Sequence, residues 1–160
     1  MKKNASRDIR ILLHDLRSVH NVGAIFRTAD AIGASRIYLS GYTPTPIDRF
    51  GRPRADLAKA ALGAEKTLAW EHVASPSRLF ASLKKEGFEI IAVEQSDGSI
   101  DYKKARPARK ALVIFGNEVS GIRQAMLRRA DATIEIPMRG KKESLNVSVS
   151  AGIVLFRLFD

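Results

Sequence analysis

Short apolar runs alternate with segments of helical periodicity along the chain, and this alternation restricts the fold more than any other feature of the sequence. The apolar runs are Ile9–Leu13, Arg36–Ser40, Glu89–Glu94, Ala111–Phe115 and Thr133–Ile136. Several of them are apolar throughout, which is typical of parallel strands that helices cover on both faces. The sequence therefore predicts an α/β fold of three layers built on one parallel sheet.

Helical periodicity is found in four segments between these strands: Val22–Ile32, Asp56–Leu62, Ser77–Glu86 and Gly121–Arg129. The last segment, Asn146–Phe159, is ambiguous because its first residues alternate like a strand. Its length and the capping residue Asn146 favour a helix. It carries no charge before Arg157, so we expect it to be buried against its own domain, against a partner subunit, or against both.

The length and charge of the chain limit its organisation and its partners. A chain of 160 residues has room for one domain, so we expect a single domain over residues 1–160. Lys and Arg number 27 against 17 Asp and Glu, a formal net charge of +10, in a chain that is 45% hydrophobic. A folded domain this basic predicts a polyanionic partner, RNA or DNA ahead of an acidic membrane surface. The competing interpretation is a basic enzyme whose charge only keeps it in solution.

Several chemistries are excluded or disfavoured by composition. The absence of cysteine excludes a disulfide framework, a thiolate metal site and a cysteine nucleophile. The histidines His14, His20 and His72 lack the i, i+4 spacing of a helical metal pair, so we predict no metal site. The longest uncharged stretch, Ser144–Phe156, has 13 residues and is too short to cross a bilayer. We therefore expect a cytoplasmic protein that does not associate with a membrane.

Two common nucleotide-binding motifs are absent from the sequence. Gly116 and Gly121 have the spacing of a phosphate-binding P-loop, but Ile122 and Arg123 stand where that loop requires Lys and Ser or Thr. No G-x-G-x-x-G occurs, and Gly23 does not follow a strand in the required way. A dinucleotide enzyme, or a methyltransferase of the ordinary Rossmann kind, is therefore disfavoured.

Three other segments combine glycine with polar side chains: 20–29, 115–121 and 136–147. Their polar residues also have a purely structural interpretation. Asn21 would N-cap a helix, and Arg27 would form an ion pair with the acid three residues on. Glu118 would be favoured by the dipole of the helix that follows it. Ser144 and Asn146 would cap the last helix.

Taken together, the segments resemble the three motifs of the SpoU/TrmH family of RNA ribose 2′-O-methyltransferases, within the SPOUT superfamily. The match is N-x-G-A-I-x-R-T-A at Asn21–Ala29, F-G-N-E-x-x-G at Phe115–Gly121 and I-P-M-x-G-x-x-x-S-L-N-V-S-V at Ile136–Val149. The motifs occur in the family's order. The resemblance implies a SPOUT fold with a C-terminal trefoil knot, S-adenosylmethionine as methyl donor, and a homodimer that methylates a ribose 2′-hydroxyl in tRNA or rRNA.

The resemblance also implies which residues hold the donor. These would be Gly116, Asn117, Ile136, Met138, Ser144 and Leu145. A further contact would come from the loop after Val93, although the motif does not identify the residue. Backbone groups would bind the adenine edge while apolar side chains sandwich its ring. A glycine at the start of the second motif is understandable where the backbone must approach a ligand closely.

The family's catalytic residue maps to Arg27, which is proposed to help deprotonate the ribose 2′-hydroxyl. A guanidinium is a poor base at neutral pH, so a clamp for a phosphate or for a developing alkoxide is at least as plausible a role. Asn21 would orient Arg27 or the ribose, and Glu118 would anchor the second motif's loop or pair with Arg27. Ser144 and Asn146 would shape the donor and ribose pocket.

The sequence resembles a minimal catalytic form, without the extra RNA-binding domain that many family members carry before the core. RNA capture would then depend on basic loops at residues 41–54 and 97–110 and on the second subunit. The alternative function is a non-catalytic RNA-binding or ribosome-assembly module that kept the fold, against which the intact motif residues argue. A third possibility is methylation of a base rather than a ribose.

Overall fold

One parallel sheet organises the fold. A computed structural model describes residues 6–160, so the first five residues of the expected single domain lie outside the described residues. The strand order is β3-β2-β1-β6-β4-β7-β5, and neighbouring strands pair in parallel. The strands are β1 Asp8–His14, β2 Arg36–Ser40, β3 Trp70–Val73, β4 Glu89–Val93, β5 Ile100–Asp101, β6 Lys110–Phe115 and β7 Ala132–Glu135.

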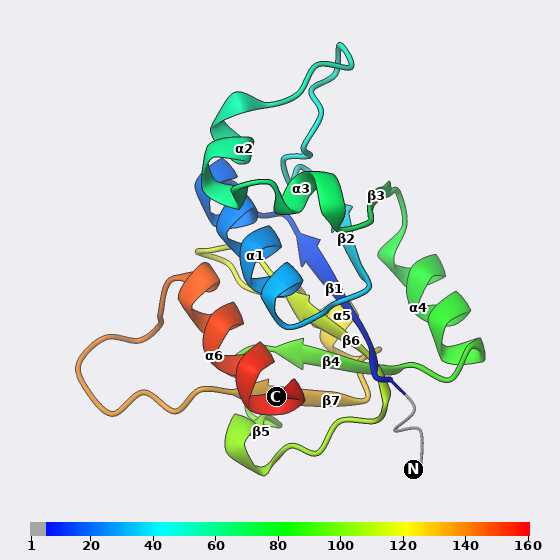
Figure 1. Ribbon diagram of the computed structural model, residues 1–160. Helices are drawn as coiled ribbons and strands as arrows, with labels where there is room; N and C mark the ends of the chain where they lie inside the picture. The colour runs from blue at the N-terminus through cyan, green and yellow to red at the C-terminus, as the bar shows by residue number, and fades with distance from the viewer. Residues whose placement is uncertain (1–5) are drawn as a thin grey trace, which may run out of the picture.

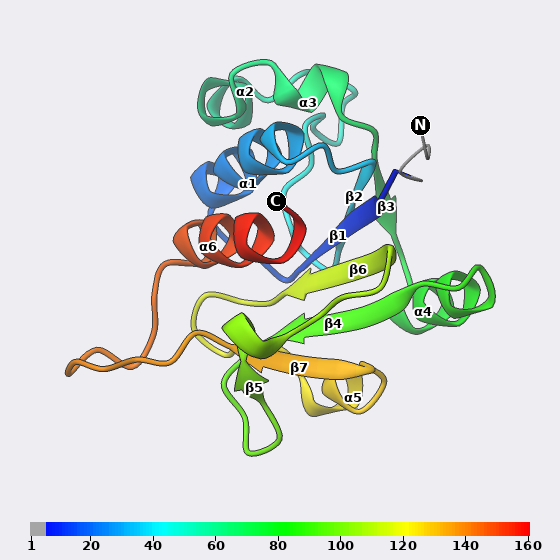
Figure 2. The ribbon, with the colours of Figure 1, turned by 60° about the horizontal axis from the view of Figure 1, so that its bottom comes forward.

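Helices cover both faces of this sheet (Figures 1 and 2). They are α1 Val19–Ala31, α2 Ala55–Ala61, α3 Ala64–Thr67, α4 Pro76–Lys85, α5 Gln124–Leu127 and α6 Val147–Phe159, with a 3₁₀ turn η1 at Tyr102–Lys104. Helices α1, α2, α3 and α6 lie on one face, while α4 and α5 lie on the other (Figure 2). The prediction of a three-layer α/β fold with a parallel sheet is confirmed.

The burial of the central strand β6 explains why its sequence is apolar throughout. Successive side chains of a strand point to opposite faces. Val113 and Phe115 pack into the core beneath α1 and α6, whereas Leu112 and Ile114 pack into the core beneath α4 and α5. Each of these four side chains is at most 1% exposed. Both faces of the strand are therefore buried, so its sequence does not alternate between apolar and polar residues.

The region after β6 differs from the prediction. A helix over Gly121–Arg129 is expected from the sequence, but α5 spans only Gln124–Leu127. The chain first completes a tight turn in which Gly121 has a φ of +69°. Arg123 is still extended, with φ −63° and ψ 146°. A positive φ and an extended residue are incompatible with a helix, so the helix begins later than its periodicity predicts.

Helix α6 confirms the helical interpretation of the last segment. Asn146 is its N-cap, and the Asn146 Oδ1 atom accepts hydrogen bonds from the backbone N–H groups of Ser148 (2.8 Å) and Val149 (3.4 Å). One side of the helix is buried against the sheet and α1, but Val149 and Phe156 remain 49% and 45% exposed. Within residues 6–160, no helix is both long enough and apolar enough to cross a membrane.

Candidate active site

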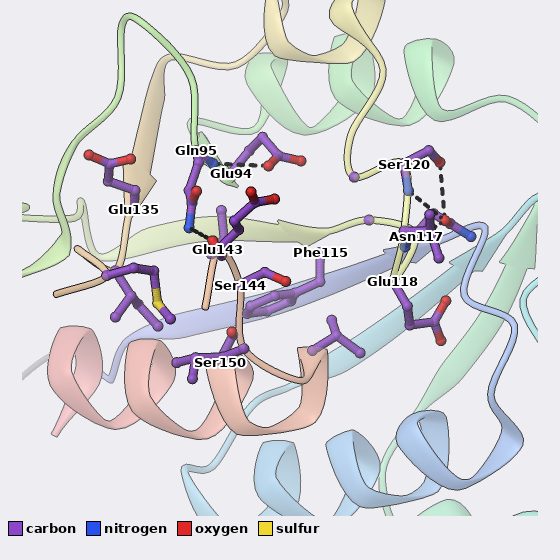
Figure 3. Close-up of a pocket in the computed structure, with 18 residues that line it drawn as sticks. Glu94, Gln95, Phe115, Asn117, Glu118, Ser120, Glu135, Glu143, Ser144 and Ser150 are labelled. Atoms are coloured by element: carbon purple, nitrogen blue, oxygen red, sulfur yellow. Dashed lines mark hydrogen bonds between the residues drawn. The ribbon is translucent and has the colours of Figure 1, made fainter. Parts of the chain in front are cut away.

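A cavity of about 340 Å³ lies at the carboxyl ends of β4, β6 and β7 (Figure 3). Its walls come from three loops: the one after β4, the one after β6, and the one joining β7 to α6. Ligands of open parallel sheets bind outside the carboxyl ends of the strands. The volume is also within the range of small-molecule sites. The cavity is therefore the first candidate for a cofactor site.

All the residues predicted to hold a donor line this cavity, so the structure brings the second and third motifs together. They are Gly116, Asn117, Ile136, Met138, Ser144 and Leu145. The loop after Val93 contributes Glu94 and Gln95, which the motif comparison did not identify. Their position in the sequence could have identified them as site residues, because both polar residues directly follow the carboxyl end of a buried strand.

Gly116 allows the loop after β6 to fold tightly beside the cavity. A Cβ atom on this residue would lie 2.6 Å from the carbonyl oxygen of Gly121 and 2.6 Å from Cγ1 of Ile122. The loop is closed by paired backbone hydrogen bonds between Asn117 and Gly121, at 3.2 and 3.0 Å. Only glycine fits at position 116 without moving the backbone of Gly121.

The Asn117 side chain holds the same loop in place rather than facing a ligand. Its Oδ1 atom accepts hydrogen bonds from the backbone N–H groups of Val119 and Ser120, at 2.9 and 2.8 Å. Its Nδ2 atom donates to the Asp15 carbonyl at 2.8 Å and to Tyr42 Oη at 2.9 Å. Because both polar atoms of its side chain are already hydrogen-bonded within the protein, Asn117 can contact a ligand in the cavity through its backbone groups.

Glu94 and Gln95 join the three loops around the cavity (Figure 3). Glu94 Oε2 accepts a hydrogen bond from the Ile122 backbone N–H at 2.7 Å, and its Oε1 accepts from the Gln95 backbone N–H at 2.9 Å. Gln95 Nε2 donates to the carbonyl of Glu143 at 2.7 Å. The β4 loop is thereby fastened to both of the other loops.

The cavity is acidic, although the protein as a whole is basic. Four glutamates line it: Glu94, Glu118, Glu135 and Glu143. Among its lining residues there is no Lys or Arg, whereas the chain carries a formal net charge of +10. This local charge favours a small ligand with positive charge and disfavours the entry of a phosphate.

A chain of hydrogen bonds connects the three motifs next to the cavity. Glu118 accepts hydrogen bonds from the backbone N–H groups of Arg17 (3.0 Å) and Ser18 (3.1 Å). Glu118 Oε1 lies 3.5 Å from Nδ2 of Asn21, which donates to it. Asn21 Oδ1 in turn accepts a hydrogen bond from Asn146 Nδ2 at 3.2 Å. Glu118 therefore anchors the loop after β6 to the start of α1. Anchoring this loop is one of the two roles predicted for Glu118, the other being a pair with Arg27.

Two structural interpretations from the sequence are wrong. Ser18, not Asn21, is the N-cap of α1, since the Ser18 side chain accepts a hydrogen bond from the Asn21 backbone N–H at 3.1 Å. Asn21 lies inside the first turn and is turned toward Asn146. Within residues 6–160, Arg27 forms no ion pair with Asp30 or with Glu118, because its side chain points to solvent from the middle of α1.

Arg27 lies outside the donor cavity. It lines a second hollow of about 570 Å³ between α1, α2 and α6, together with His20, Lys59 and the α6 residues Val149 and Phe156. This hollow is basic and partly apolar, in contrast to the acidic cavity. Four of the predicted site residues therefore lie close together in the folded molecule: Asn21, Glu118, Ser144 and Asn146. The predicted catalytic residue, Arg27, lies in the neighbouring hollow instead.

Comparison with known proteins identifies the family. The sequence model of the SpoU rRNA methylase family matches residues 8–156, which include all three motifs and both hollows. The chain belongs to the SpoU rRNA methylase family. The resemblance noted in the sequence is confirmed.

Relatives of this SpoU family chain include RNA-modifying enzymes of two kinds. It is 32% identical over 149 residues to a tRNA (guanosine(18)-2′-O)-methyltransferase of Escherichia coli strain K12, covering 93% of this chain and 62% of the relative. It is 37% identical over 145 residues to a 23S rRNA (guanosine-2′-O-)-methyltransferase of Neisseria meningitidis, covering 91% of this chain and 55% of the relative. The chain thus spans less than two thirds of these relatives.

Solved structures of family members share its fold. An AdoMet-bound rRNA methyltransferase from Sinorhizobium meliloti matches with a TM-score of 0.83 and 30% identity, over 94% of this chain and 55% of that one. A TrmH/SpoU tRNA-modifying enzyme from A. aeolicus matches with a TM-score of 0.82 and 28% identity, over 95% of this chain and 74% of that one.

Glu118 should stabilise this SpoU fold at neutral pH. Burial of the carboxyl group opposes its ionisation, but the hydrogen bonds from the Arg17 and Ser18 N–H groups outweigh burial and hold the pKa of Glu118 below its ordinary value of 4.5. A lowered carboxyl pKa contributes stability above the ordinary pKa, and that contribution disappears as the pH falls through the folded-state pKa.

We therefore expect Glu118→Gln to lower the free energy of unfolding by about 1 kcal/mol at pH 7, with the difference from wild type shrinking as the pH falls below the ordinary carboxyl pKa of 4.5. Urea unfolding at pH 7 and at pH 3.5 measures both values. Glu86→Gln is the control, since Glu86 is exposed and its side chain bonds to none of the described residues. An equal loss at both pH values would mean that the charge of Glu118 is unimportant.

No group of three or more His, Asp or Glu side chains in the described part of the chain is arranged to hold a metal ion. The metal-independent chemistry expected from the sequence remains a prediction.

Proposed function

We propose that this chain transfers a methyl group from S-adenosylmethionine to a ribose 2′-hydroxyl of tRNA or rRNA. The observation that carries the proposal is the meeting of the second and third family motifs around one acidic cavity at the carboxyl ends of β4, β6 and β7. Relatives named as tRNA and rRNA guanosine 2′-O-methyltransferases, and an AdoMet-bound neighbour, support it. These also favour an enzyme over a non-catalytic RNA-binding or ribosome-assembly module.

The properties of the cavity fit S-adenosylmethionine. When bound, this donor supplies a methyl group activated by a positively charged sulfur. Glu94, Glu118, Glu135 and Glu143 provide negative charge around the cavity for such a cation. Gly116 allows the tight turn after β6, and this turn forms one wall of the cavity. Ile136 and Leu145 offer apolar surfaces for the two faces of the adenine ring.

The residues beside the cavity position the ribose. The hydrogen-bonded series Glu118, Asn21 and Asn146 fixes the amide of Asn21 and the start of α6. Ser144 lines the donor cavity and is free to bond to the sugar or the donor. We assign Arg27 the role of a clamp that holds a substrate phosphate and stabilises negative charge on the ribose oxygen. The hydroxyl proton then passes to a phosphate oxygen or to water, because a guanidinium remains protonated at neutral pH.

A homodimer would reconcile the separation of Arg27 from the donor cavity. The hollow around Arg27 is bordered by the exposed apolar residues Leu62, Val149 and Phe156, which are 65%, 49% and 45% exposed. We infer that α6 packs against α6 or α1 of a second copy about a two-fold axis, covering this surface. Arg27 of one chain would then complete the site of the other.

The dimer has a direct test. Phe156→Asp should convert the protein at micromolar concentration from a dimer to a monomer by light scattering, because it places a charge in the covered surface. Methyl transfer by the monomer should fall to background. A wild-type protein that is monomeric and still active on RNA would disprove the shared site. Ile100→Asp, an exposed apolar position on β5, is the matched control.

We propose three further properties of the chain. The C-terminal part of the chain forms a trefoil knot, which would bring the loops after β6 and β7 together around the donor. Residues 1–160 act as one catalytic domain and bind RNA through their own basic loops. The protein works in the cytoplasm, where its RNA substrates are found. High TM-scores to solved family members support the first of these.

Donor binding tests the proposed function and the expected metal independence together. We expect isothermal titration calorimetry to detect binding of S-adenosylmethionine to the protein in EDTA, with an affinity unchanged by added Mg²⁺. Methyl transfer should also survive EDTA once the RNA has been folded. The absence of donor binding would contradict the proposal, as would transfer that returns only when Mg²⁺ is added to folded RNA.

A further inference from the structure

The segment between β2 and α2 forms a small hairpin that stands away from the rest of the domain (Figure 1, at the top). We call residues 46–54 the arginine hairpin. Ile47 and Pro53 form an antiparallel bridge across it, and the Arg54 N–H donates to the Pro46 carbonyl at 2.9 Å. The sequence indicates an irregular loop here, but its ends are held together by backbone hydrogen bonds.

The turn at the end of the arginine hairpin is fixed by Asp48. Asp48 Oδ1 accepts hydrogen bonds from the backbone N–H groups of Phe50 at 2.8 Å and Arg52 at 2.9 Å. Gly51, with a φ of +77°, supplies the left-handed conformation that the turn needs. The turn therefore has a defined shape without any contact to a partner.

This ordered turn presents an exposed aromatic ring with two cations close to it. Phe50 is 64% exposed. The guanidinium carbons of Arg49 and Arg52 lie 4.8 and 5.1 Å from the centroid of its ring. Arg52 has only a loose ion pair with Asp48, at 3.9 Å, and Arg49 forms none with the residues that the structure describes. Phe50 contributes nothing to the core, so the turn presents both ring and charge to solvent.

An unpaired nucleotide matches this surface in both shape and charge. Every base has a flat face that stacks on an aromatic side chain, and the phosphates beside it attract guanidinium groups. A polyanion fits this basic turn better than a second copy of the chain does, because each copy carries a net charge of +10 itself. A duplex fits poorly, because its bases are already stacked.

We propose that the arginine hairpin binds an unpaired nucleotide of the substrate RNA, with Phe50 stacking on the base and Arg49 and Arg52 holding the adjacent phosphates. This inference rests on the proposed function, since it assumes that the chain acts on RNA. The hairpin runs directly into α2, whose Lys59 lines the same hollow as Arg27. One short helix therefore joins the hairpin to the hollow that contains Arg27.

The stacking contact is tested with the full-length protein and two fluorescent probes, a single-stranded oligouridine and an RNA duplex of equal length. Phe50→Ala should weaken binding of the single strand roughly 10-fold, while duplex binding changes less than about twofold. Phe50→Trp should restore the affinity, since it keeps an aromatic face. Ile100→Ala, which removes an exposed apolar side chain from β5 at the far edge of the sheet, should have no effect.

The phosphate contacts of Arg49 and Arg52 are tested by the salt dependence of the affinity for RNA. Arg49→Gln and Arg52→Gln should each reduce the slope of log affinity against log salt by about 0.7 for the single strand. Equal losses for single strand and duplex in Phe50→Ala would overturn the stacking contact, as would no loss for either probe. A Phe50→Ala protein of lower oligomeric mass would show that a second copy covers the ring.

Measuring S-adenosylmethionine binding shows whether a negative result concerns the hairpin alone or the proposed function as a whole. Phe50→Ala should bind S-adenosylmethionine like wild type, because the hairpin is remote from the cavity at β4, β6 and β7. If wild type methylates RNA and Phe50→Ala binds the single strand normally, only the hairpin's role is wrong. If wild type binds no donor, the proposed function itself fails.

Discussion

Arg27→Ala should slow methyl transfer strongly and leave donor binding intact. We expect kcat/KM to fall by about 100- to 1000-fold, the effect of removing one preorganised donor from a developing anion. The dissociation constant for S-adenosylmethionine should change less than about twofold, because Arg27 lines the hollow between α1, α2 and α6 and not the donor cavity. Single-turnover transfer to tRNA or rRNA and calorimetry measure the two quantities.

Arg27→Lys separates charge from geometry at the same position. Lysine keeps the positive charge but loses the planar, two-pronged donor set that binds phosphate. We expect most of the loss seen with alanine to remain. Near wild-type activity in Arg27→Lys would show that charge alone suffices. Arg128→Ala is the matched control, since Arg128 is exposed beside α5 on the opposite face of the sheet.

Gly116→Ala should remove donor binding. Its new Cβ would lie 2.6 Å from the Gly121 carbonyl oxygen, so the closed turn between Asn117 and Gly121 must open. This turn forms one wall of the donor cavity. We expect the affinity for S-adenosylmethionine to fall at least about 10-fold and stability to fall by about 1–3 kcal/mol, the usual cost of overpacking.

Gly98→Ala is the control for this prediction, because a Cβ at Gly98 would meet nothing within 4 Å. Calorimetry gives the donor affinity of both variants, and urea unfolding gives their stability. Wild-type donor affinity in a folded Gly116→Ala protein would mean that the loop after β6 does not contact the donor.

The interior of the sheet was predictable from the sequence, and its edges were not. The central strands β1, β4 and β6 are buried on both faces, so their apolar runs are visible without knowledge of the fold. The edge strand β3 exposes Glu71 and His72, and β5 has only two residues. Neither has a continuous apolar run, and both form because a neighbouring strand supplies hydrogen-bonding partners.

The donor cavity was predictable as a set of residues, but the arrangement of the polar residues beside it was not. Ser18 and Asn21 are both good N-cap residues, and the choice of Ser18 depends on Glu118, which reaches α1 from a loop about a hundred residues later. The distance between Arg27 and the cavity also depends on how α1 packs against α2 and α6. Motif order contains no information on such long-range contacts.

The most direct test of ribose methylation is the identity of the methylated nucleoside. Total RNA from cells lacking the gene is incubated with the protein and S-adenosylmethionine that carries a labelled methyl group, then digested to nucleosides. We predict that all the label is found in one 2′-O-methylnucleoside and that Arg27→Ala incorporates it at least about 100-fold more slowly. Label on a base, or no label although the donor binds, would contradict ribose 2′-O-methylation.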